Sequence, residues 1–237
     1  MKIGPFSVIG ANVKIGDNCE IGNHVTLCDN TFIGNKCKIF HSASIGEIPQ
    51  DLKFGGEKTI TIIGDNTVIR EYVTVNRGTD ALKKTEIGSN VLLMASSHVA
   101  HDCIVGDNVI MSNLSTLGGH VTVGNWAVLG GGVLVDQFSK IGEDSFIGGG
   151  FRAVQDVPPY ILAAEEPLKF QGINSVGLKR RGFSLDDRKV IKNVYKIFFL
   201  SKKNRKDALL NINAQYPDNK IAKNIVSFIS LSGRGII

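Results

Sequence analysis

The sequence predicts a mainly β protein, a parallel β-helix shaped like a triangular prism, followed by a small α-helical domain at its C-terminal end. Three observations predict this fold class. An aliphatic residue recurs every six positions from Ile3 to Ile147, glycine follows that residue in most repeats, and the period disappears after the segment "DVPPY".

The six-residue period covers 22 blocks, which start at positions 3 to 45, 63 to 75 and 87 to 147 in steps of six. Every first position is Ile, Leu, Val or Met, and the second position is Gly in 14 of the 22. An α-helix repeats its apolar face every 3.6 residues, so a strict period of six indicates a short strand plus a corner. Gly, Asn and Asp at the second to fourth positions suit corners with positive φ.

Repeated units of strand and corner stack into a parallel β-helix. Three blocks for each coil make a triangular prism, in which residues three blocks apart lie one coil above the other at about 4.8 Å. About eight coils are expected. The spacing alone does not determine the hand of the coil.

The fifth block position predicts the narrow part of the core. From Ser7 to Ser145 it holds only small or β-branched residues in blocks that do not run into an interruption. Three of the four cysteines, Cys19, Cys37 and Cys103, fall in this column, and no C-x-x-C pair occurs. We expect them to be small core residues and not zinc ligands or disulfide partners.

Two interruptions keep the phase of the repeats. The step from the block start Ile45 to the block start Ile63 equals three blocks, and the step from Val75 to Ile87 equals two blocks. Both steps are whole numbers of blocks. We therefore expect two loops, at about residues 49–60 and 78–86, to leave corners of one continuous solenoid that spans residues 1–157.

The second domain is expected over residues 158–237, beginning at Pro158–Pro159, which punctuate the boundary. A loop with the basic segment "LKRRG", Leu178–Gly182, comes first. Ser184 is a plausible N-cap of a helix with apolar residues at helical spacing through Phe198. Two shorter helices are expected at about Lys206–Ala214 and Asn219–Leu231.

Charge divides between the two regions. Residues 1–152 carry 12 Lys and Arg against 15 Asp and Glu, a net charge of −3, whereas residues 153–237 carry 15 against 7, a net charge of +8. The basic region predicts an acidic partner. Nucleic acid ranks last among such partners, because the basic residues are not interleaved with aromatic residues.

The sequence contains neither the pattern of a membrane span nor that of a signal peptide, and this predicts the cellular compartment. No apolar stretch of about 18 residues occurs, so no membrane span is expected. The start, "MKIGPFSVIG", has no charged stretch leading into an apolar run, so no signal peptide is expected. We therefore expect a cytoplasmic protein.

The segment "SSHVAHDC", Ser96–Cys103, contains the residues best suited to chemistry. His101 and Asp102 take the third and fourth positions of the block that starts at Val99, and Gly119 and His120 take the same positions one coil later. The four residues should form a two-by-two cluster on one edge of the prism, with His98 just before it. Ordinary surface residues, a zinc site and an acyl-transfer site are the three interpretations.

An acyl-transfer site is the interpretation that we favour. A histidine can act as the general base, a carboxylate can orient it, and a backbone N–H can bind a tetrahedral oxyanion where a glycine allows close approach. Three histidines could also hold zinc, as in the trimeric β-helix carbonic anhydrases. The carboxylate directly after His101 and the glycine behind it make a metal site the less favoured alternative.

Several motifs resemble the family of UDP-N-acetylglucosamine acyltransferases that open lipid A biosynthesis. They are "SIGEIPQDLKF", "REYVTVNRGT", "SHVAHDCIVGDN", "LGGHVTVGN", "QDVPPY" and "GLKRRGFS", and they cover nearly the whole chain. The resemblance implies a left-handed β-helix and a homotrimer with active sites between subunits. It also implies transfer of an (R)-3-hydroxyacyl group from acyl carrier protein to the glucosamine 3-position of UDP-N-acetylglucosamine.

The resemblance implies a role for each matching residue. His101 would be the general base, Asp102 its partner and Gly119 the oxyanion donor. No further cofactor or metal is implied, because the phosphopantetheine of acyl carrier protein carries the acyl group. The implied substrate-binding residues are Asp51, Lys53, Asn76, His98, His120, Asp136, Gln137, Asn174, Arg180 and Arg181.

The sequence departs from the family pattern at a few positions. Asn76 and Asp136 each replace a histidine, and Val176 replaces an acid, so the acceptor could bear a 3-amino group in place of the hydroxyl. Gly149 aligns with the position that sets acyl-chain length, and the length itself stays open. One N-terminal coil fewer than in the family is expected.

Other functions remain open on the sequence alone. The fold also carries acetyl-CoA-dependent nucleotide-sugar acetyltransferases, which are the leading alternative, and zinc-dependent carbonic anhydrases. A catalytically inactive solenoid that serves as a structural or binding module is the alternative from another class of protein.

Overall fold

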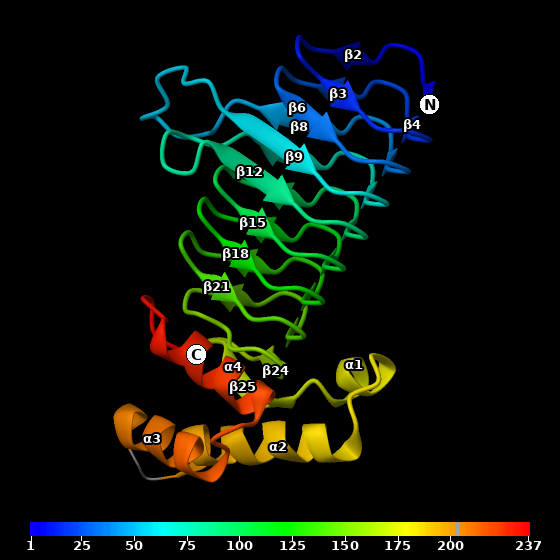
Figure 1. Ribbon diagram of the computed structural model, residues 1–237. Helices are drawn as coiled ribbons and strands as arrows, with labels where there is room; N and C mark the ends of the chain where they lie inside the picture. The colour runs from blue at the N-terminus through cyan, green and yellow to red at the C-terminus, as the bar shows by residue number, and fades with distance from the viewer. Residues whose placement is uncertain (202–203) are drawn as a thin grey trace.

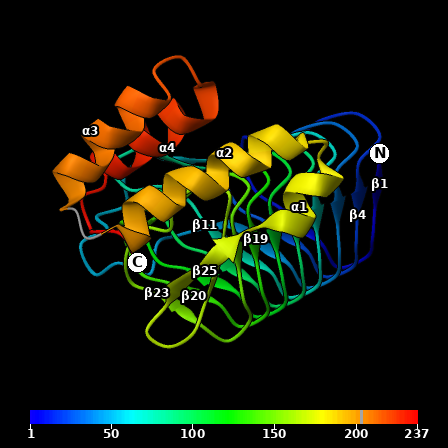
Figure 2. The ribbon, with the colours of Figure 1, turned by 90° about the horizontal axis from the view of Figure 1, so that it is seen from below.

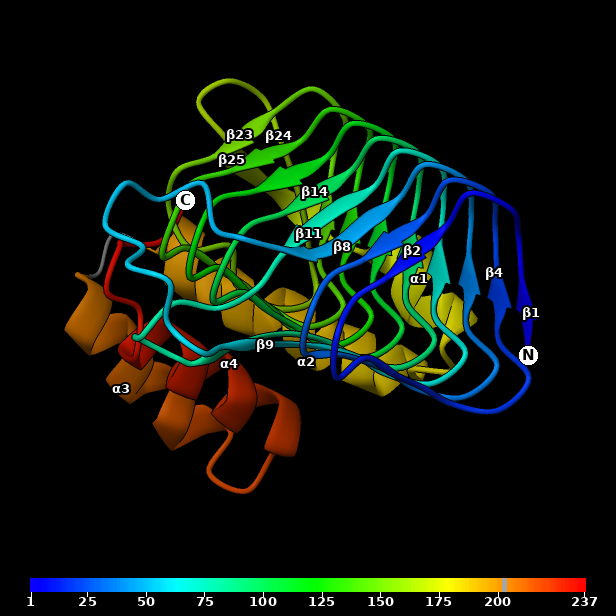
Figure 3. The ribbon, with the colours of Figure 1, turned by 90° about the horizontal axis from the view of Figure 1, so that it is seen from above.

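Three parallel sheets form the walls of a triangular prism in the computed structural model, which describes residues 1–201 and 204–237. Strands of the three sheets alternate along the chain, so that each coil contributes one strand to each wall (Figure 1). Viewed from its N-terminal end, the receding chain turns counterclockwise, which is the left-handed sense (Figure 3). The fold is therefore the predicted left-handed parallel β-helix.

The strands are short, and their order within each sheet follows the coils. Sheet A contains β1 (Lys2–Ile3), β4 (Glu20–Ile21), β7 (Lys38–Ile39), β10 (Val68–Ile69), β13 (Leu92–Leu93), β16 (Ile110–Met111), β19 (Val128–Leu129), β22 (Phe146–Ile147), β24 (Ile161–Ala164) and β25 (Lys169–Ile173). Sheet B contains β2 (Val8–Ile9), β5 (Thr26–Leu27), β8 (Ser44–Glu47), β11 (Thr74–Asn76), β14 (His98–Val99), β17 (Thr116–Leu117), β20 (Leu134–Val135) and β23 (Arg152–Ala153). Sheet C contains β3 (Lys14–Ile15), β6 (Thr31–Ile33), β9 (Ile60–Ile63), β12 (Lys84–Ile87), β15 (Ile104–Val105), β18 (Thr122–Val123) and β21 (Lys140–Ile141).

The register between coils is the predicted one. Ile3 pairs with Ile21 and Val99 pairs with Leu117, in each case one coil apart. Successive coils keep equivalent block positions opposite each other, with one bulge between Val75 and Asn76. The turns between sheets therefore stack into three edges. We name them the AB edge, the BC edge and the CA edge after the sheets they join.

The first and fifth block positions point inward and fill the prism. Ile45, Ile69, Leu93 and Leu117 are completely buried, and so are fifth-position residues such as Val73. Full burial of one such aliphatic side chain stabilises a fold by about 1.5–3 kcal/mol. Cys19, Cys37 and Cys103 are buried and unpaired in the fifth-position column, as the sequence predicts.

The corner geometry corrects one part of the sequence interpretation. Left-handed backbone occurs at the fourth block position, where Asn18, Asp102 and His120 have φ between 57° and 62°. Most second-position glycines have ordinary φ, and their role is close packing. A Cβ on Gly64 would lie only 2.5 Å from the carbonyl carbon of Gly88 in the next coil, so no larger residue fits there.

A ladder of polar side chains stabilises the CA edge. The Asn35 side chain accepts a hydrogen bond from the Asp17 N–H at 2.9 Å, and the Asp65 carboxylate accepts from the Asn35 N–H at 2.6 Å. Asp107 and Asn125 repeat the pattern further along. Turn N–H groups that the sheets leave free thereby find acceptors one coil away.

Both inserted loops leave the BC edge. Residues 48–59 connect β8 to β9, and residues 77–83 connect β11 to β12, each from sheet B to sheet C. Figure 3 shows both segments projecting from the prism on the same side. The BC edge therefore carries both loops, and the next turn along this edge, after β14, contains His101.

The C-terminal region begins with a hairpin that the sequence did not predict. β24 pairs in parallel with β22, where Leu162 lies opposite Phe146, and then pairs antiparallel with β25. Sheet A thus continues past residue 157. The division into domains at 157 and 158 stays a prediction.

Helices cover the C-terminal end of the prism (Figure 2). The expected loop at Leu178–Gly182 was wrong in part, because α1 occupies Ser175–Arg180. The three later helices are confirmed within a few residues: α2 (Leu185–Tyr195), continued by the π-helix η1 (Lys196–Leu200), α3 (Arg205–Gln215) and α4 (Lys220–Ser230). Within the described residues, none of these helices has the length and apolarity needed to cross a membrane.

Side-chain hydrogen bonds connect the helices to the solenoid. The buried Tyr195 hydroxyl donates to the Pro159 carbonyl at 2.5 Å. The Asn224 side chain donates to the Glu143 carboxylate at 2.8 Å and to the Tyr160 hydroxyl oxygen at 2.7 Å. Since these hydrogen bonds are wholly or partly buried, they define how α2 and α4 sit on the last coils.

Replacing Gly64 with alanine tests the close packing of coils. We expect Gly64→Ala to lower the free energy of unfolding by about 1–3 kcal/mol, because the added methyl group meets backbone that cannot move away. The control is Gly131→Ala, where a Cβ lies 3.4 Å from its nearest contact and should change stability by less than about 0.5 kcal/mol. Chemical denaturation measures both, and equal effects would contradict this explanation of the repeat.

Candidate active site

The predicted cluster assembles on the BC edge. His101 and Asp102 form the turn after β14, and Gly119 and His120 form the turn after β17 one coil later. The His101 Nδ1 lies 2.8 Å from Asp102 Oδ2, and the His120 Nε2 lies 3.8 Å from the same oxygen. Side chains from two consecutive coils thus meet at one carboxylate.

The Asp102 carboxylate is fully buried and has several hydrogen-bond donors. Oδ1 accepts from the Thr79 N–H at 3.0 Å and the Leu82 N–H at 3.1 Å, and Oδ2 accepts from the Thr79 hydroxyl at 2.6 Å. Burial by itself raises the pKa of Asp102, but the hydrogen bonds from Thr79 and His101 hold this pKa below its ordinary value. Asp102 is therefore ionised at neutral pH.

An ionised Asp102 determines which nitrogen of His101 carries the proton. A carboxylate only accepts hydrogen bonds, so the proton lies on Nδ1 and leaves Nε2 as the basic nitrogen. The His101 ring packs over Gly119, where a Cβ would lie 2.6 Å from Cε1 and 2.7 Å from Nε2. Gly119 is required here by close approach, because any side chain would displace the imidazole.

The two neighbouring histidines are held neutral. Burial lowers the pKa of His98, and the nearby His101 lowers it further. Burial also lowers the pKa of His120, more than the charge of Asp102 raises it. His98 Nδ1 lies 2.7 Å from the Thr74 hydroxyl, and the His120 ring stacks on Phe138 with ring centres 4.5 Å apart. Both side chains are therefore oriented.

A groove of about 350 Å³ lies beside His101 on the sheet B side of this edge. It is lined by Gln50, Asn76, His98, Ala100, His101, Thr116, Gly118, Gly119, Leu134, Val135, Asp136 and Gln137. Besides His101 and Gly119, this lining includes four predicted substrate residues, and it combines polar groups with apolar strand residues. An apolar chain and a polar head could lie in it together.

Asn76 offers an unused hydrogen-bond acceptor to the groove. Its side chain is almost fully buried, and its Nδ2 donates to the Ile48 carbonyl at 2.9 Å. Its Oδ1 is buried without a hydrogen-bond partner among the described residues. A buried acceptor without a partner is costly, so a donor from a bound ligand would stabilise it.

Asp136 has a partner that sequence reasoning missed. The Arg234 guanidinium, from the segment after α4, donates to Asp136 Oδ2 at 2.6 Å. The same segment pairs its backbone with the last coil, where the Asp156 N–H donates to the Gly235 carbonyl at 2.9 Å. No six-residue phase relates position 234 to position 136, so spacing could not reveal this pair.

The first inserted loop brings Asp51 toward the cluster. The charge of Asp51 acts to raise the pKa of His120, although burial has the larger effect. The Asp51 carboxylate also accepts a hydrogen bond from the Lys53 N–H at 3.0 Å, which shapes the loop. Lys53 itself is exposed.

Three predicted substrate residues lie in or beside α1, and two of them contact another edge of the same chain. Asn174 is the N-cap of α1, accepting from the Gly177 N–H at 3.1 Å and donating to the Asp144 carbonyl at 2.9 Å. Arg181 forms an ion pair with the buried Asp144 carboxylate and lies 5.3 Å from the Trp126 ring centre. Asp144 and Trp126 are turn residues of the CA edge, and Arg180 is exposed at the end of α1.

Gly149 lies on the third edge. It belongs to the AB turn after β22, and a Cβ there would lie 3.0 Å from the Gly131 carbonyl oxygen of the preceding coil. Within a single chain, the predicted catalytic residues therefore lie on the BC edge, two predicted substrate-binding residues contact the CA edge, and the predicted chain-length residue lies on the AB edge.

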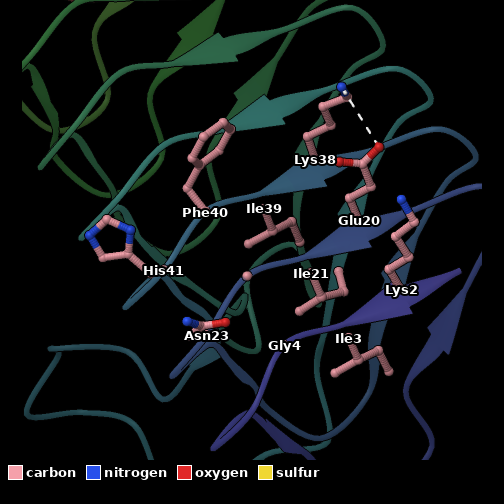
Figure 4. Close-up of a pocket in the computed structure, with 11 residues that line it drawn as sticks. Lys2, Ile3, Gly4, Glu20, Ile21, Asn23, Lys38, Ile39, Phe40 and His41 are labelled. Carbon is pink, nitrogen blue, oxygen red and sulfur yellow. Dashed lines mark ion pairs between the residues drawn. The ribbon is translucent and has the colours of Figure 1, made fainter.

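A larger hollow lies away from the histidines, on the sheet A side of the first coils. It has a volume of about 490 Å³ and is lined by strand residues such as Lys2, Glu20 and Lys38 (Figure 4). Glu20 and Lys38 form an exposed ion pair at 3.8 Å. This hollow contains no arrangement of base, acid and backbone donor among its described lining residues, so chemistry and not size identifies the groove at the BC edge.

The cluster also has the composition of a metal site. His101, Asp102 and His120 each offer one ligand atom, and these atoms lie within 4.8 Å of one another. The Asp102 carboxylate, however, already accepts four hydrogen bonds, one of them with the His101 ring. A metal on Asp102 would displace these donors from a buried oxygen, so the set fits proton transfer better than metal binding.

Comparison with known families agrees with this geometry. A sequence profile described as "Udp N-acetylglucosamine O-acyltransferase; Domain 2" matches residues 156–237. A second profile, for the bacterial transferase hexapeptide with six repeats, matches residues 2–29 and 84–119. The C-terminal region and two stretches of the solenoid thus match profiles of transferases.

Two curated relatives are acyl-[acyl-carrier-protein]--UDP-N-acetylglucosamine O-acyltransferases. The protein of Syntrophobacter fumaroxidans is 43% identical over 99% of this chain and 92% of its own length. The protein of Thermodesulfovibrio yellowstonii is 45% identical over 99% of this chain and 91% of its own length.

Solved structures of such acyltransferases have the same fold. That of the UDP-N-acetylglucosamine acyltransferase of Francisella novicida superposes with a TM-score of 0.97 at 39% identity, covering 99% of this chain and 87% of the other. That of Bacteroides fragilis gives a TM-score of 0.86 at 42% identity, covering 100% and 97%. The resemblance seen in the motifs is thereby confirmed, and the chain belongs to the UDP-N-acetylglucosamine O-acyltransferase family.

Proposed function

We propose that the protein transfers an (R)-3-hydroxyacyl group from acyl carrier protein to the glucosamine 3-position of UDP-N-acetylglucosamine, the first step of lipid A biosynthesis. The observation that carries this proposal is the His101–Asp102 pair packed against Gly119 in the groove. Membership of the family indicates the substrates, and the pair supplies the base that their chemistry requires.

The reaction follows from the positions of these groups. His101 Nε2 takes the proton of the acceptor hydroxyl while the hydroxyl oxygen attacks the thioester carbonyl carbon. The carbonyl oxygen becomes an oxyanion, which the Gly119 N–H binds. When the tetrahedral intermediate collapses, the C–S bond breaks and the imidazolium returns its proton to the leaving thiolate. Asp102 stabilises the imidazolium in between, as a buried carboxylate does in a catalytic triad.

The turn after β17 leaves the Gly119 N–H in a suitable place to bind the oxyanion. The backbone hydrogen bonds of this turn use the Gly118 N–H, which donates to Val135, and the Gly119 carbonyl, which accepts from Phe138. Because Gly119 has no side chain, a carbonyl carbon attacked near His101 Nε2 comes within reach of its N–H. The Gly118–Gly119 pair thus allows the close approach of the His101 ring and leaves the Gly119 N–H for the oxyanion.

The proposed assembly is a homotrimer with active sites between subunits. The division of the implied site residues among three edges supports it, because a second copy can supply the edge that a first copy lacks. A row of outward apolar residues on sheet A supports it as well, and parallel sheets are normally covered on both faces. The row consists of Val68, Leu92, Ile110, Val128 and Phe146, which lie opposite one another in successive strands.

Acyl carrier protein is the proposed acidic partner. Lys179 and Arg180 stand in the last turn of α1, within a region of net charge +8, and both are exposed. Arginine binds phosphate groups in fixed geometry, which suits the phosphopantetheine arm or the nucleotide. All of these substrates are water-soluble, so we place the protein in the cytoplasm and propose no cofactor of its own.

The acceptor with a 3-amino group is the second candidate. The Oδ1 of Asn76, which has no partner among the described residues, and the carboxylate of Asp136 are both acceptors that line the groove where the family commonly has histidines. Acceptors favour a ligand group that donates hydrogen bonds, and an amine donates more of them than a hydroxyl. The product would then be an amide.

Product analysis tests the function directly. Purified protein is incubated with UDP-N-acetylglucosamine or its 3-amino analogue and a series of (R)-3-hydroxyacyl thioesters of acyl carrier protein, with acetyl-CoA in a parallel reaction. We expect mass spectrometry to show one hydroxyacyl chain added to one of the two sugars. Acetylation alone would favour the acetyltransferase alternative. Metal analysis of the purified protein tests the carbonic anhydrase alternative, which one tightly bound zinc per site would favour.

Replacing His101 tests the assignment of the base. We expect His101→Ala to lower kcat by about 10²–10⁴-fold, the usual contribution of a general base, while the assembly stays intact. His24→Ala is the control, because His24 stacks on Phe6 in an early turn of the AB edge. A His101→Ala variant with nearly wild-type kcat would rule out His101 as the base.

The ionised state of Asp102 predicts a pH dependence of stability. Its folded pKa lies below the unfolded value of about 3.9, so its hydrogen bonds stabilise the fold fully above about pH 4. That stabilisation is lost as the pH falls through the folded pKa. In chemical denaturation, Asp102→Asn should therefore be less stable than wild type at pH 7, and the difference should shrink below about pH 4.

Gly64→Ala serves as the control for this measurement. Its defect is steric, so the difference from wild type should not depend on pH in the same range. If the Asp102→Asn defect were equally independent of pH, the carboxylate would not be held ionised by its neighbours.

A further inference from the structure

Thr79, in the second inserted loop, contacts the same carboxylate oxygen as the proposed base. Its hydroxyl donates to Asp102 Oδ2 at 2.6 Å, and the His101 Nδ1 lies 2.8 Å from that oxygen. Oδ1 is occupied by two backbone donors of the loop, the N–H groups of Thr79 and Leu82. The hydroxyl is thus the one side chain of the loop that shares an oxygen with the imidazole.

The direction of the Thr79 hydroxyl is determined by its surroundings. The Ala81 N–H donates to its oxygen at 3.3 Å, so the hydroxyl proton is directed to Asp102. On the other side, the Asp102 N–H donates to the Thr85 hydroxyl at 2.9 Å, which holds the backbone of the turn. Asp102 has φ of 57°, so its carboxylate leaves the turn toward the loop.

We propose that Thr79 is a positioning residue for proton transfer, acting through Asp102 on His101; this inference rests on the proposed function. The Thr79 hydroxyl holds Oδ2 within hydrogen-bond distance of His101 Nδ1 and shares the negative charge of this oxygen. Without the hydroxyl, Oδ2 is free to rotate away from Nδ1, and the ring can then turn its Nε2 away from the acceptor. Thr79 is not among the residues that line the groove, so its replacement should affect kcat and leave substrate binding unchanged.

The other charged and titratable groups near the carboxylate do not replace this hydroxyl. His120 is a third neighbour of Oδ2, but at 3.8 Å its Nε2 lies beyond a normal hydrogen bond. The main influences on the pKa of Asp102 are burial and the hydrogen bonds from Thr79, His101 and the Leu82 N–H, and Asp51 acts instead on the pKa of His120. Thr79 is therefore the short side-chain contact to Oδ2 besides His101.

Two substitutions separate the hydroxyl from the rest of the side chain. Thr79→Val keeps the shape and the backbone donors to Oδ1, so the loop should stay attached to the turn. We expect it to lower kcat about tenfold, the size expected for a hydrogen bond to a charged group, with both KM values within about twofold of wild type. Thr79→Ser restores the hydroxyl and should return kcat to within about threefold of wild type.

Thr67→Val is the matched control. The Thr67 hydroxyl is buried, whereas Thr79 is partly buried; it donates to the Gly88 carbonyl at 2.9 Å and accepts from the Val91 N–H at 3.2 Å, but it belongs to the CA side of the solenoid. A comparable loss of stability without loss of kcat is expected. If Thr79→Val kept wild-type kcat, or if Thr79→Ser were as impaired as Thr79→Val, the proposal would be wrong.

A measurement without substrate keeps this test separate from the proposed function. In protein labelled with ¹⁵N-histidine, the Nδ1–H of His101 should give a downfield proton resonance that disappears in Asp102→Asn. Thr79→Val should shift or broaden it, and Thr79→Ser should restore it. An unchanged resonance in Thr79→Val overturns the positioning role, whereas a wild-type protein that transfers no acyl group overturns only the proposed function.

Discussion

The parallel register of the coils is the constraint on which the rest of the structure depends. Each strand pairs with its equivalent one coil away, so equivalent block positions stack along the whole prism. The register holds because one aliphatic residue per block fills the interior, a second-position glycine lets successive backbones approach, and a left-handed fourth residue turns the corner. A shift of one residue would turn every buried side chain outward.

The register also converts sequence spacing into a chemical site. His101, Asp102, Gly119 and His120 meet because they occupy two adjacent turns of one edge. In a flexible loop, a buried carboxylate would lose its hydrogen bonds whenever it moved, unless the donors moved with it. On this edge the donors come from the rigid turn and from a loop that the carboxylate itself holds, so the site is organised before any substrate arrives.

The Asp102 carboxylate therefore has two roles in one position. It orients the imidazole of the proposed base, and it attaches the loop of residues 77–83 to the solenoid through backbone donors. The free energy that keeps it ionised while buried comes from these hydrogen bonds. Loop insertion at this edge and the chemistry at this edge are thus physically connected.

Most of the fold could be predicted from the chain because its interactions are periodic. The block starts, the fifth-position column, the phase-preserving loops and the helix that begins after Ser184 all depend on residues that are near in sequence or one coil apart. The β24–β25 hairpin and α1 escaped prediction, since they pair with or pack on the last coils without any repeat of their own.

The same distinction applies to the site. By itself the sequence determined the prism, its register and the meeting of His101, Asp102, Gly119 and His120, because stacking makes neighbours of residues at a constant interval. Only the tertiary structure decided that Thr79 and Leu82 cover the carboxylate, that Arg234 reaches Asp136 and that Arg181 turns to Asp144. These contacts join loops and a terminal segment to the solenoid, and no period relates such segments, so packing alone selects their partners.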